Sequence, residues 1–290
     1  MADADTDRLA EDYRRLRDDV GAVWILRDAL RVTGSDALAF LDGQLSQDIK
    51  ALAVGASVDS LLLQPHGKVV AMLRVTREDG DAFVLDTDAG FGDSVVERLE
   101  RFKLRTKATI ERDPDWKCVA VRGPRAHEVA SGVVVDWPGL AGVDIIGHDP
   151  RVPADVPLVG IDAYEVARIE AGVPVMGREL TDETIPAEAT GVVERSVSFT
   201  KGCFTGQELV ARIDSRGGNV RRRLCGVELS ATSVPATGSE LVADGAPVGV
   251  ITPAACSPRT GAVVALAYVA RKVELPAAVD GGVVKGLPLS

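Results

Sequence analysis

The stretch that decides the fold is residues 58–85, VDSLLLQPHGKVVAMLRVTREDGDAFVL. It contains three apolar runs, at 58–64, 68–76 and 82–85. The two breaks between these runs, PHG at 65–67 and EDGD at 78–81, consist of residues that favour tight turns. Short apolar runs joined by such turns predict an antiparallel meander of three strands.

A helix is expected directly after this meander. Beyond Gly92, the apolar residues Val95, Val96, Leu99 and Phe102 recur on one helical face, and Glu97, Arg98, Glu100 and Arg101 are expected to face solvent. Short strands are expected at 107–111 and 118–122. Strands that are joined by hairpins and followed by helices favour an α+β fold over a doubly wound parallel sheet.

The flanking residues extend this pattern in both directions. Residues 22–32 predict one strand. Residues 35–49 predict a helix or two short helical turns, with Ser35 as the cap. Residues 141–160 are rich in prolines and predict a loop, whereas 161–171 have helical spacing. A polar break at 230–240 precedes a tail divided by Gly and Pro, which predicts a small all-β module of roughly 70 residues.

The composition excludes several classes of protein. The chain has 290 residues, is 46% hydrophobic and 26% charged, and carries a net charge of −10. These values are typical of a globular protein of one large or two smaller domains, not of a disordered tail, a collagen or a coiled-coil rod. The negative charge disfavours a generic nucleic-acid binder, because phosphate binding needs clustered cations.

The location of the protein is predicted from features that the sequence lacks. The first nineteen residues contain seven acids and four arginines, where a secretory signal needs an apolar run. No apolar stretch approaches the roughly 18 residues that a membrane span needs. The four cysteines include no CxxC pair, which favours a reducing compartment. We therefore expect a cytoplasmic protein without a membrane partner.

The most unusual segment is KGCFTGQE at 201–208, in which Cys203 stands between Gly202 and Phe204. A lysine two residues before the thiol, Lys201, would lower the thiol's pKa if the two groups lay close together. From 201 to 223 the chain has six cations and two acids, a local net charge of +4 that would attract a polyanion. The competing interpretation is a buried cysteine and a solvated arginine run.

A second segment, RIEAGVP at 168–174, places Glu170 at the end of a helical pattern. A carboxylate there could accept two hydrogen bonds from the adjacent N–H groups of a nitrogen heterocycle. The alternative is a surface carboxylate or an ion pair with Arg168. His66 and His127 have no second ligand at metal-binding spacing, so no metal site is predicted.

Taken in order, these segments resemble a known family. KGCFTGQE at 201–208 is similar to the K-G-C-[FY]-x-G-Q-E signature of YgfZ-type folate-binding proteins, which are relatives of the glycine-cleavage T-protein, an aminomethyltransferase. RIEAGVP at 168–174 resembles an R-x-E-x-G element shared with that enzyme. Three further segments resemble family elements: 40–48 (FLDGQLSQD), 64–68 (QPHGK) and 249–269.

The resemblance implies a fold, a ligand and a set of site residues. The fold would be a GcvT-like multi-domain ring with ferredoxin-like α+β portions over residues 1–222, in two interleaved subdomains, and a small β-barrel over 223–290. The ligand would be tetrahydrofolate or a folate derivative. Its implied contacts are Glu170 at the pterin, Arg223 or a neighbouring arginine at the glutamate tail, and Gln44 and Gln207. Cys203 would supply a functional thiol, tuned by Lys201.

One departure from the family pattern bears on mechanism. After the hairpin glycine, the T-protein pattern has two acids, whereas this chain has Ala71 and Met72. Neither side chain can transfer a proton. The resemblance therefore implies an accessory protein, not a classical enzyme, that supports assembly or repair of iron–sulfur enzymes, including radical enzymes that modify tRNA. The alternatives are a folate-dependent aminomethyltransferase or demethylase, and a module that binds tRNA directly.

Overall fold

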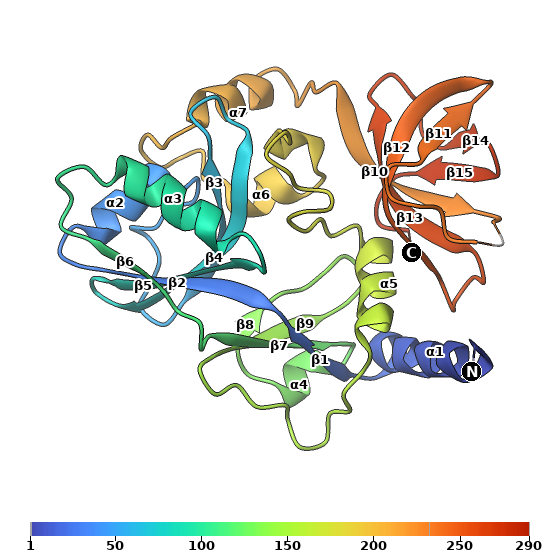
Figure 1. The fold of residues 1–290 in the computed structure, drawn as a ribbon, viewed down its shortest axis with the longest axis horizontal. Coiled ribbons are helices and arrows are strands. Elements are labelled where there is room, and N and C mark those ends of the chain that lie inside the picture. Colours follow the sequence, from blue (N-terminus) through green and yellow to red (C-terminus); the bar gives the residue numbers. More distant parts are fainter. Residues whose placement is uncertain (1, 232, 290) are drawn as a thin grey trace. The chain divides into compact units, whose positions relative to one another are not determined.

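The computed structural model describes residues 2–231 and 233–289 and divides them into two compact units (Figure 1). Unit 2 consists of Leu26–Trp116 and Val175–Val220, and unit 1 consists of the remaining described residues. Each unit therefore combines segments that are far apart in the sequence. The sequence-based boundary at 222/223 stays a prediction.

Unit 2 is built on a five-stranded antiparallel sheet in the order β3-β4-β5-β2-β6. The strands are β2 (Arg27–Thr33), β3 (Ser57–Leu63), β4 (Val69–Asp79), β5 (Ala82–Asp88) and β6 (Thr109–Arg112). Strands β3, β4 and β5 are the predicted meander, which is confirmed. The turn at 65–67 closes with a bond from the Gln64 amide to the Lys68 carbonyl, and Gly67 takes the left-handed φ of 86° that this turn requires.

The two faces of this sheet differ in what covers them. Helices α2 (Ala37–Gln44) and α3 (Gly92–Phe102) cover one face, where Leu30, Leu73 and Leu85 are buried against Leu41 and Leu99. Segments from 175–213 pack on Leu61 and Leu63 of the opposite face, and they include η1 (Pro186–Glu188), α6 (Val192–Ser196) and α7 (Gln207–Asp214).

Unit 1 contains a four-stranded sheet and a barrel. The sheet order is β1-β7-β9-β8, with β1 (Gly21–Ile25), β7 (Lys117–Arg122), β8 (Val133–Val134) and β9 (Gly142–Gly147). Three helices belong to the unit: α1 (Ala2–Asp18), α4 (Ala126–Val129) and α5 (Ile161–Ala171). Helix α5 packs on α1, β12 and β13, so its residues are almost all buried.

The tail forms the expected β-barrel. Its six strands run in the order β11-β12-β13-β10-β15-β14, and contact between β11 and β14 nearly closes the sheet. The bounds are β10 (Arg222–Leu229), β11 (Glu240–Ala243), β12 (Ala246–Cys256), β13 (Val263–Ala270), β14 (Ala277–Val279) and β15 (Gly282–Lys285). The interior is apolar and includes Val227, Ile251 and Val269.

Several local predictions are wrong. Residues 22–32 form two strands in different sheets, because the chain breaks at Leu26, whose side chain is 81% exposed. The expected helix at 35–49 ends at Gln44, and Ser35 does not cap it. Residues 141–160 contain strand β9. Helix α1, in the acidic N-terminal segment, is not among the predicted elements.

The expected absence of a membrane-spanning segment was based on hydropathy. Among residues 2–231 and 233–289, no helix has both the length and the apolar character to cross a bilayer. The cytoplasmic location stays a prediction.

Candidate functional site

Cys203 lies on a loop between α6 and α7, and its side chain is exposed. The loop is fixed at its C-terminal end by a close approach to the 64–67 hairpin. Gly206 has a φ of 84°, and a Cβ on it would lie 2.7 Å from the Gln64 carbonyl oxygen. The Thr205 amide donates to the Gly43 carbonyl at 3.2 Å. The motif therefore holds its thiol at the surface on a loop with a rigid base.

Lys201 fixes the other end of the loop. Its ammonium donates to the carbonyl oxygens of Asp42, in the last turn of α2, and of Leu45 and Gln47, just beyond that helix. It lies 3.3 Å from the Asp42 carboxylate. Cations stabilise helix C-termini in this way. Burial lowers the pKa of Lys201, and Asp42 opposes that shift. The ammonium is engaged by these carbonyl groups and by Asp42, and the tuning of Cys203 by Lys201 stays a prediction.

Gln44 and Gln207 are both in unit 2, where they hold the same loop. The Gln44 side-chain oxygen accepts bonds from Arg98 at 3.2 Å and from the Thr205 hydroxyl at 3.4 Å. The Gln207 side-chain oxygen accepts from the Phe204 amide at 3.1 Å, at the start of α7. Gln44 and Gln207 therefore stabilise the loop on the two sides of Cys203. Their contact with a ligand stays a prediction.

Glu170 lies in unit 1, near the end of α5, and is only 1% exposed. Its two carboxylate oxygens accept bonds from the Tyr13 hydroxyl at 2.5 Å and the Ser257 hydroxyl at 2.6 Å, and Arg259 lies 3.7 Å away. Burial, together with the Glu170 carboxylate, raises the pKa of Tyr13 to about 12, so the phenol remains a donor at neutral pH. The carboxylate thus joins α1, α5 and the turn after β12.

Arg223 begins the barrel in β10 and is also in unit 1. It donates to the Val273 carbonyl at 2.6 Å, and its Nε is buried without a hydrogen-bond partner among the described residues. The neighbouring Arg222 stacks on the Tyr268 ring, 4.3 Å from its centroid. The predicted contact of an arginine in this run with a glutamate tail stays a prediction.

A charged cluster on the unit 2 sheet was not predicted from the sequence. Asp86 is fully buried and accepts bonds from Arg74 at 2.9 Å and Arg27 at 2.8 Å. Burial alone would raise the pKa of Asp86, but the two guanidinium groups hold it below its usual value. The sequence does contain a signal for this cluster. Arg74 and Asp86 each interrupt an otherwise apolar strand, and the two residues lie directly opposite each other in the β4–β5 pair.

Met72 and Asp59 lie on the same sheet face as this cluster. Met72 contacts the Met176 sulfur through its amide at 3.3 Å, and Arg195 lies 3.6 Å from the Met72 sulfur. Asp59 is 3.8 Å from Arg195, and burial raises its pKa although 39% of its side chain is exposed. Ala71, by contrast, is fully buried against α2 and α3. Of the two positions at which the T-protein pattern has acids, only 72 therefore faces the charged cluster.

Comparison with known proteins matches these features to one family. A model of the GCVT N-terminal domain matches residues 5–139, and a model of the glycine-cleavage T-protein C-terminal barrel domain matches residues 222–284. The structure of the glycine-cleavage-system aminomethyltransferase T from Bartonella henselae is similar, with a TM-score of 0.77 and 21% identity. The similarity covers 97% of this chain and 89% of that one, so this chain has the fold of that aminomethyltransferase.

Sequence relatives identify a more specific group within the T-protein superfamily. An uncharacterized protein of Haemophilus influenzae is 30% identical over 194 residues, which is 66% of this chain and 68% of the relative. A "tRNA-modifying protein YgfZ" of Yersinia pestis is 28% identical over 237 residues, covering 72% of this chain and 71% of the relative. The chain belongs to the YgfZ type of the glycine-cleavage T-protein superfamily.

Proposed function

We propose that this chain is a tetrahydrofolate-binding accessory protein that supports the assembly or repair of iron–sulfur enzymes, among them radical enzymes that modify tRNA. The observation that carries the proposal is the exposed Cys203 on a loop whose two ends are fixed. The T-protein fold supports folate as the ligand, and the printed name of the YgfZ relatives supports a link to tRNA modification.

The thiol is the group that would act on a partner. After loss of its proton, the Cys203 sulfur can donate an electron pair to an iron of a partner's cluster and later release it, with no net change in oxidation state. An exposed position is needed for this contact, whereas a buried cysteine is inert. Cys118 and Cys225 are buried, so Cys203 and Cys256 are the exposed cysteines.

The residues present fit folate binding only after a rearrangement at Glu170. Both of its carboxylate oxygens already accept hydrogen bonds, so a pterin would have to replace one donor. Ser257 is the donor better able to leave, because a serine hydroxyl turns away by rotation about one bond, whereas Tyr13 projects from a helix. On this proposal the pterin N–H groups take the place of the Ser257 hydroxyl.

The test of the accessory role is complementation of a strain that lacks its own YgfZ-type protein. Cys203→Ser is expected to lose support for iron–sulfur enzyme activity while tetrahydrofolate affinity is retained. Cys256→Ser, which removes the other exposed thiol, is the matched control and is expected to complement fully. Full complementation by Cys203→Ser would exclude the thiol from the function.

A second candidate function is favoured by Asp59. This carboxylate has a raised pKa and lies on the same sheet face as Met72, where it could serve as a proton donor in one-carbon transfer. A folate-dependent aminomethyltransferase would then form methylenetetrahydrofolate from an aminomethyl donor with release of ammonia. A demethylase would instead transfer an N-methyl group to tetrahydrofolate, which gives methyltetrahydrofolate and the demethylated amine. Turnover by the purified protein that Asp59→Asn abolishes would establish this function in place of the accessory role.

A further inference from the structure

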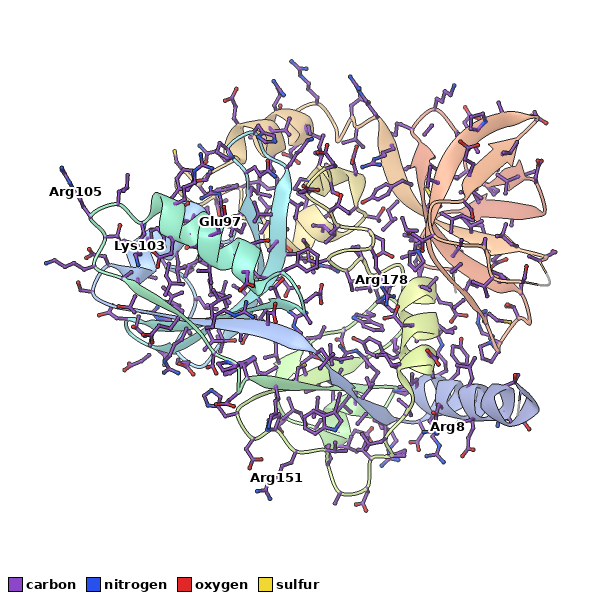
Figure 2. All side chains as sticks on the ribbon, viewed as in Figure 1. Arg8, Glu97, Lys103, Arg105, Arg151 and Arg178 are labelled. Carbon is purple, nitrogen blue, oxygen red and sulfur yellow. The ribbon has the colours of Figure 1, made fainter. Side chains whose placement is uncertain are left out.

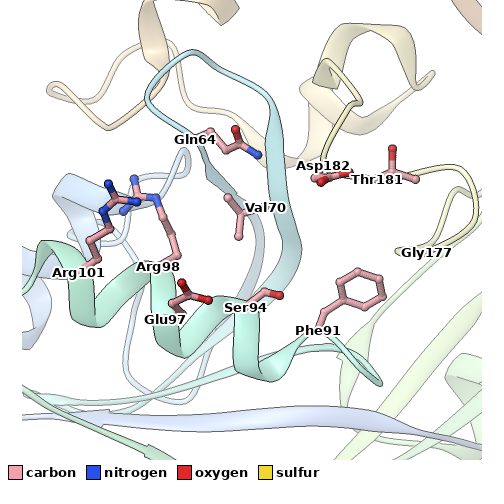
Figure 3. Close-up of a pocket in the computed structure, with 10 residues that line it drawn as sticks. All are labelled: Gln64, Val70, Phe91, Ser94, Glu97, Arg98, Arg101, Gly177, Thr181 and Asp182. Atoms are coloured by element: carbon pink, nitrogen blue, oxygen red, sulfur yellow. The ribbon is translucent and has the colours of Figure 1, made fainter.

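A pocket of about 520 Å³ lies within unit 2 (Figure 3). Its lining residues come from 64–101 and 177–182, which precede Cys203 in the sequence. It is formed by helix α3, the 64–70 hairpin and the loop at 177–182. Arg98 and Arg101 rise from α3 at one end, and Thr181 and Asp182 lie at the other. Its volume falls within the range of small-molecule sites in proteins, roughly 300–1,000 Å³.

Arg98 is the unusual residue in this pocket. The helical pattern predicts that it faces solvent, but its side chain is only 8% exposed. Neither Arg98 nor Arg101 forms an ion pair with a carboxylate among the described residues, and the buried Arg98 Nε has no hydrogen-bond partner there. Burial lowers the pKa of Arg98, and the neighbouring Arg101 lowers it further. Buried cations are normally paired. Among the described residues no carboxylate forms an ion pair with Arg98, although Glu97 also lines the pocket.

The Arg98 guanidinium is nevertheless held in one place. Its Nη2 donates to the Leu63 carbonyl at 3.1 Å, its Nη1 donates to Gln44 at 3.2 Å, and it stacks on the Phe102 ring at 3.7 Å. An anion that binds here therefore meets a donor that is already oriented. Such preorganisation reduces the entropic cost of binding.

The rest of the pocket suits a flat ring that carries N–H groups. Phe91 and Val70 supply apolar walls, and Gly177 lets its loop approach the Phe91 ring, since a Cβ there would lie 3.1 Å from the ring. Gln64, Thr181 and Asp182 supply acceptors for hydrogen bonds from the edge of such a ring.

We propose that this pocket binds a nucleoside monophosphate, with the phosphate between Arg98 and Arg101 and the base against Phe91. A phosphate is favoured over a carboxylate because its additional oxygens can accept bonds from two guanidinium groups at once. The residues that line this pocket belong to unit 2, whereas Glu170, the proposed pterin contact, belongs to unit 1.

The test is calorimetric titration of the full chain with AMP. Arg101→Ala removes an exposed guanidinium from the pocket and is expected to weaken AMP binding about tenfold or more, as for loss of a hydrogen bond to a charged group. Arg105→Ala is the matched control, because Arg105 is an exposed arginine of the same unit that extends away from the pocket (Figure 2). It is expected to leave AMP affinity unchanged.

Two further measurements make the test decisive. Adenosine, which lacks the phosphate, and inorganic phosphate, which lacks the ring, are each expected to bind at least tenfold more weakly than AMP. Arg98→Lys keeps the charge but loses the planar fork, and it is expected to weaken AMP binding, with folding checked by its unfolding transition.

Several outcomes would overturn the proposal: no AMP binding at millimolar concentration, equal affinity in Arg101→Ala, or inorganic phosphate binding as tightly as AMP. Displacement of AMP by tetrahydrofolate would also overturn it, because the pocket would then belong to the folate site. Loss of folate binding alone, with AMP binding intact, would instead refute the proposed function and leave this inference standing.

Discussion

Gly202 and Gly206 lie on either side of Cys203 in the sequence. Substitution of each by alanine should have a very different effect on the stability of the protein. In Gly206→Ala the new Cβ would lie 2.7 Å from the Gln64 carbonyl oxygen and 2.8 Å from the Leu63 Cβ, and φ is 84°. In Gly202→Ala the new Cβ would have no heavy atom within 4 Å, and Gly202 does not have a positive φ. Both substitutions are close to Cys203 in the sequence, but only the one at Gly206 creates a steric clash. A difference in stability between the two variants therefore reports on the packing at Gly206.

The magnitude follows from two costs at Gly206. A left-handed conformation costs an alanine about 1–2 kcal/mol, and overpacking typically costs about 1–3 kcal/mol. We expect Gly206→Ala to lower the free energy of unfolding by about 2–5 kcal/mol, whereas a change within about 0.5 kcal/mol is expected for Gly202→Ala.

The assay is urea unfolding followed by far-UV circular dichroism, with the rate of Cys203 alkylation by a small reagent measured in parallel. Since Gly206 holds the loop against the hairpin, its substitution should also change the alkylation rate, and that of Gly202 should change it less. Equal stability of the two variants would refute the conclusion that the loop base is rigid.

Two further predictions concern buried carboxylates. Asp86→Asn should lower the free energy of unfolding by about 3–5 kcal/mol at neutral pH, because Arg74 and Arg27 both lose their bonds to this carboxylate, although Arg27 keeps its ion pair with Asp88. The folded pKa of Asp86 is depressed, so its stabilisation is complete above the unfolded pKa of about 3.9 and is lost as the pH falls through the folded pKa. Urea titrations from pH 7 to 3 should therefore bring wild type and variant closer together, and a constant difference would contradict this. Ser257→Ala should lower stability by about 1–3 kcal/mol yet tighten tetrahydrofolate binding, because it removes the hydroxyl that the pterin must replace. Calorimetry that finds unchanged or weaker affinity would remove Glu170 from the proposed pterin contact.

The sequence predicts the meander and the barrel because local signals determine both. The turn at 65–67 carries its own geometry in Pro and Gly, and apolar runs on each side fix the strands. The division of 22–32 into two strands is not predictable in this way, because Leu26 is apolar yet exposed where the chain passes from one sheet to another. Only tertiary structure determines that transition.

The same limit applies to the site residues. A helical wheel places Arg98 on the charged, solvent-facing side of α3. In the structure its side chain is buried, because it donates to the Leu63 carbonyl and stacks on the Phe102 ring. Likewise, the role of Lys201 depends on carbonyl groups of residues 42–47, more than 150 positions away in the sequence. Spacing identified the segments that matter, whereas the partners of each side chain required the structure.

The alternation of charge within strands carried information that a sequence analysis could have used. Asp59, Arg74 and Asp86 each interrupt an apolar strand, and register brings Arg74 opposite both acids. Charged residues at paired positions of a buried sheet predict an ion-pair cluster.

On the proposed function, this chain binds folate without transferring a one-carbon group. The most direct test of this proposal combines calorimetric titration with tetrahydrofolate and an assay for methylenetetrahydrofolate in the presence of an aminomethyl donor. We predict saturable binding at one folate per chain and no product. Absence of binding, or formation of product at a catalytic rate, would contradict the account.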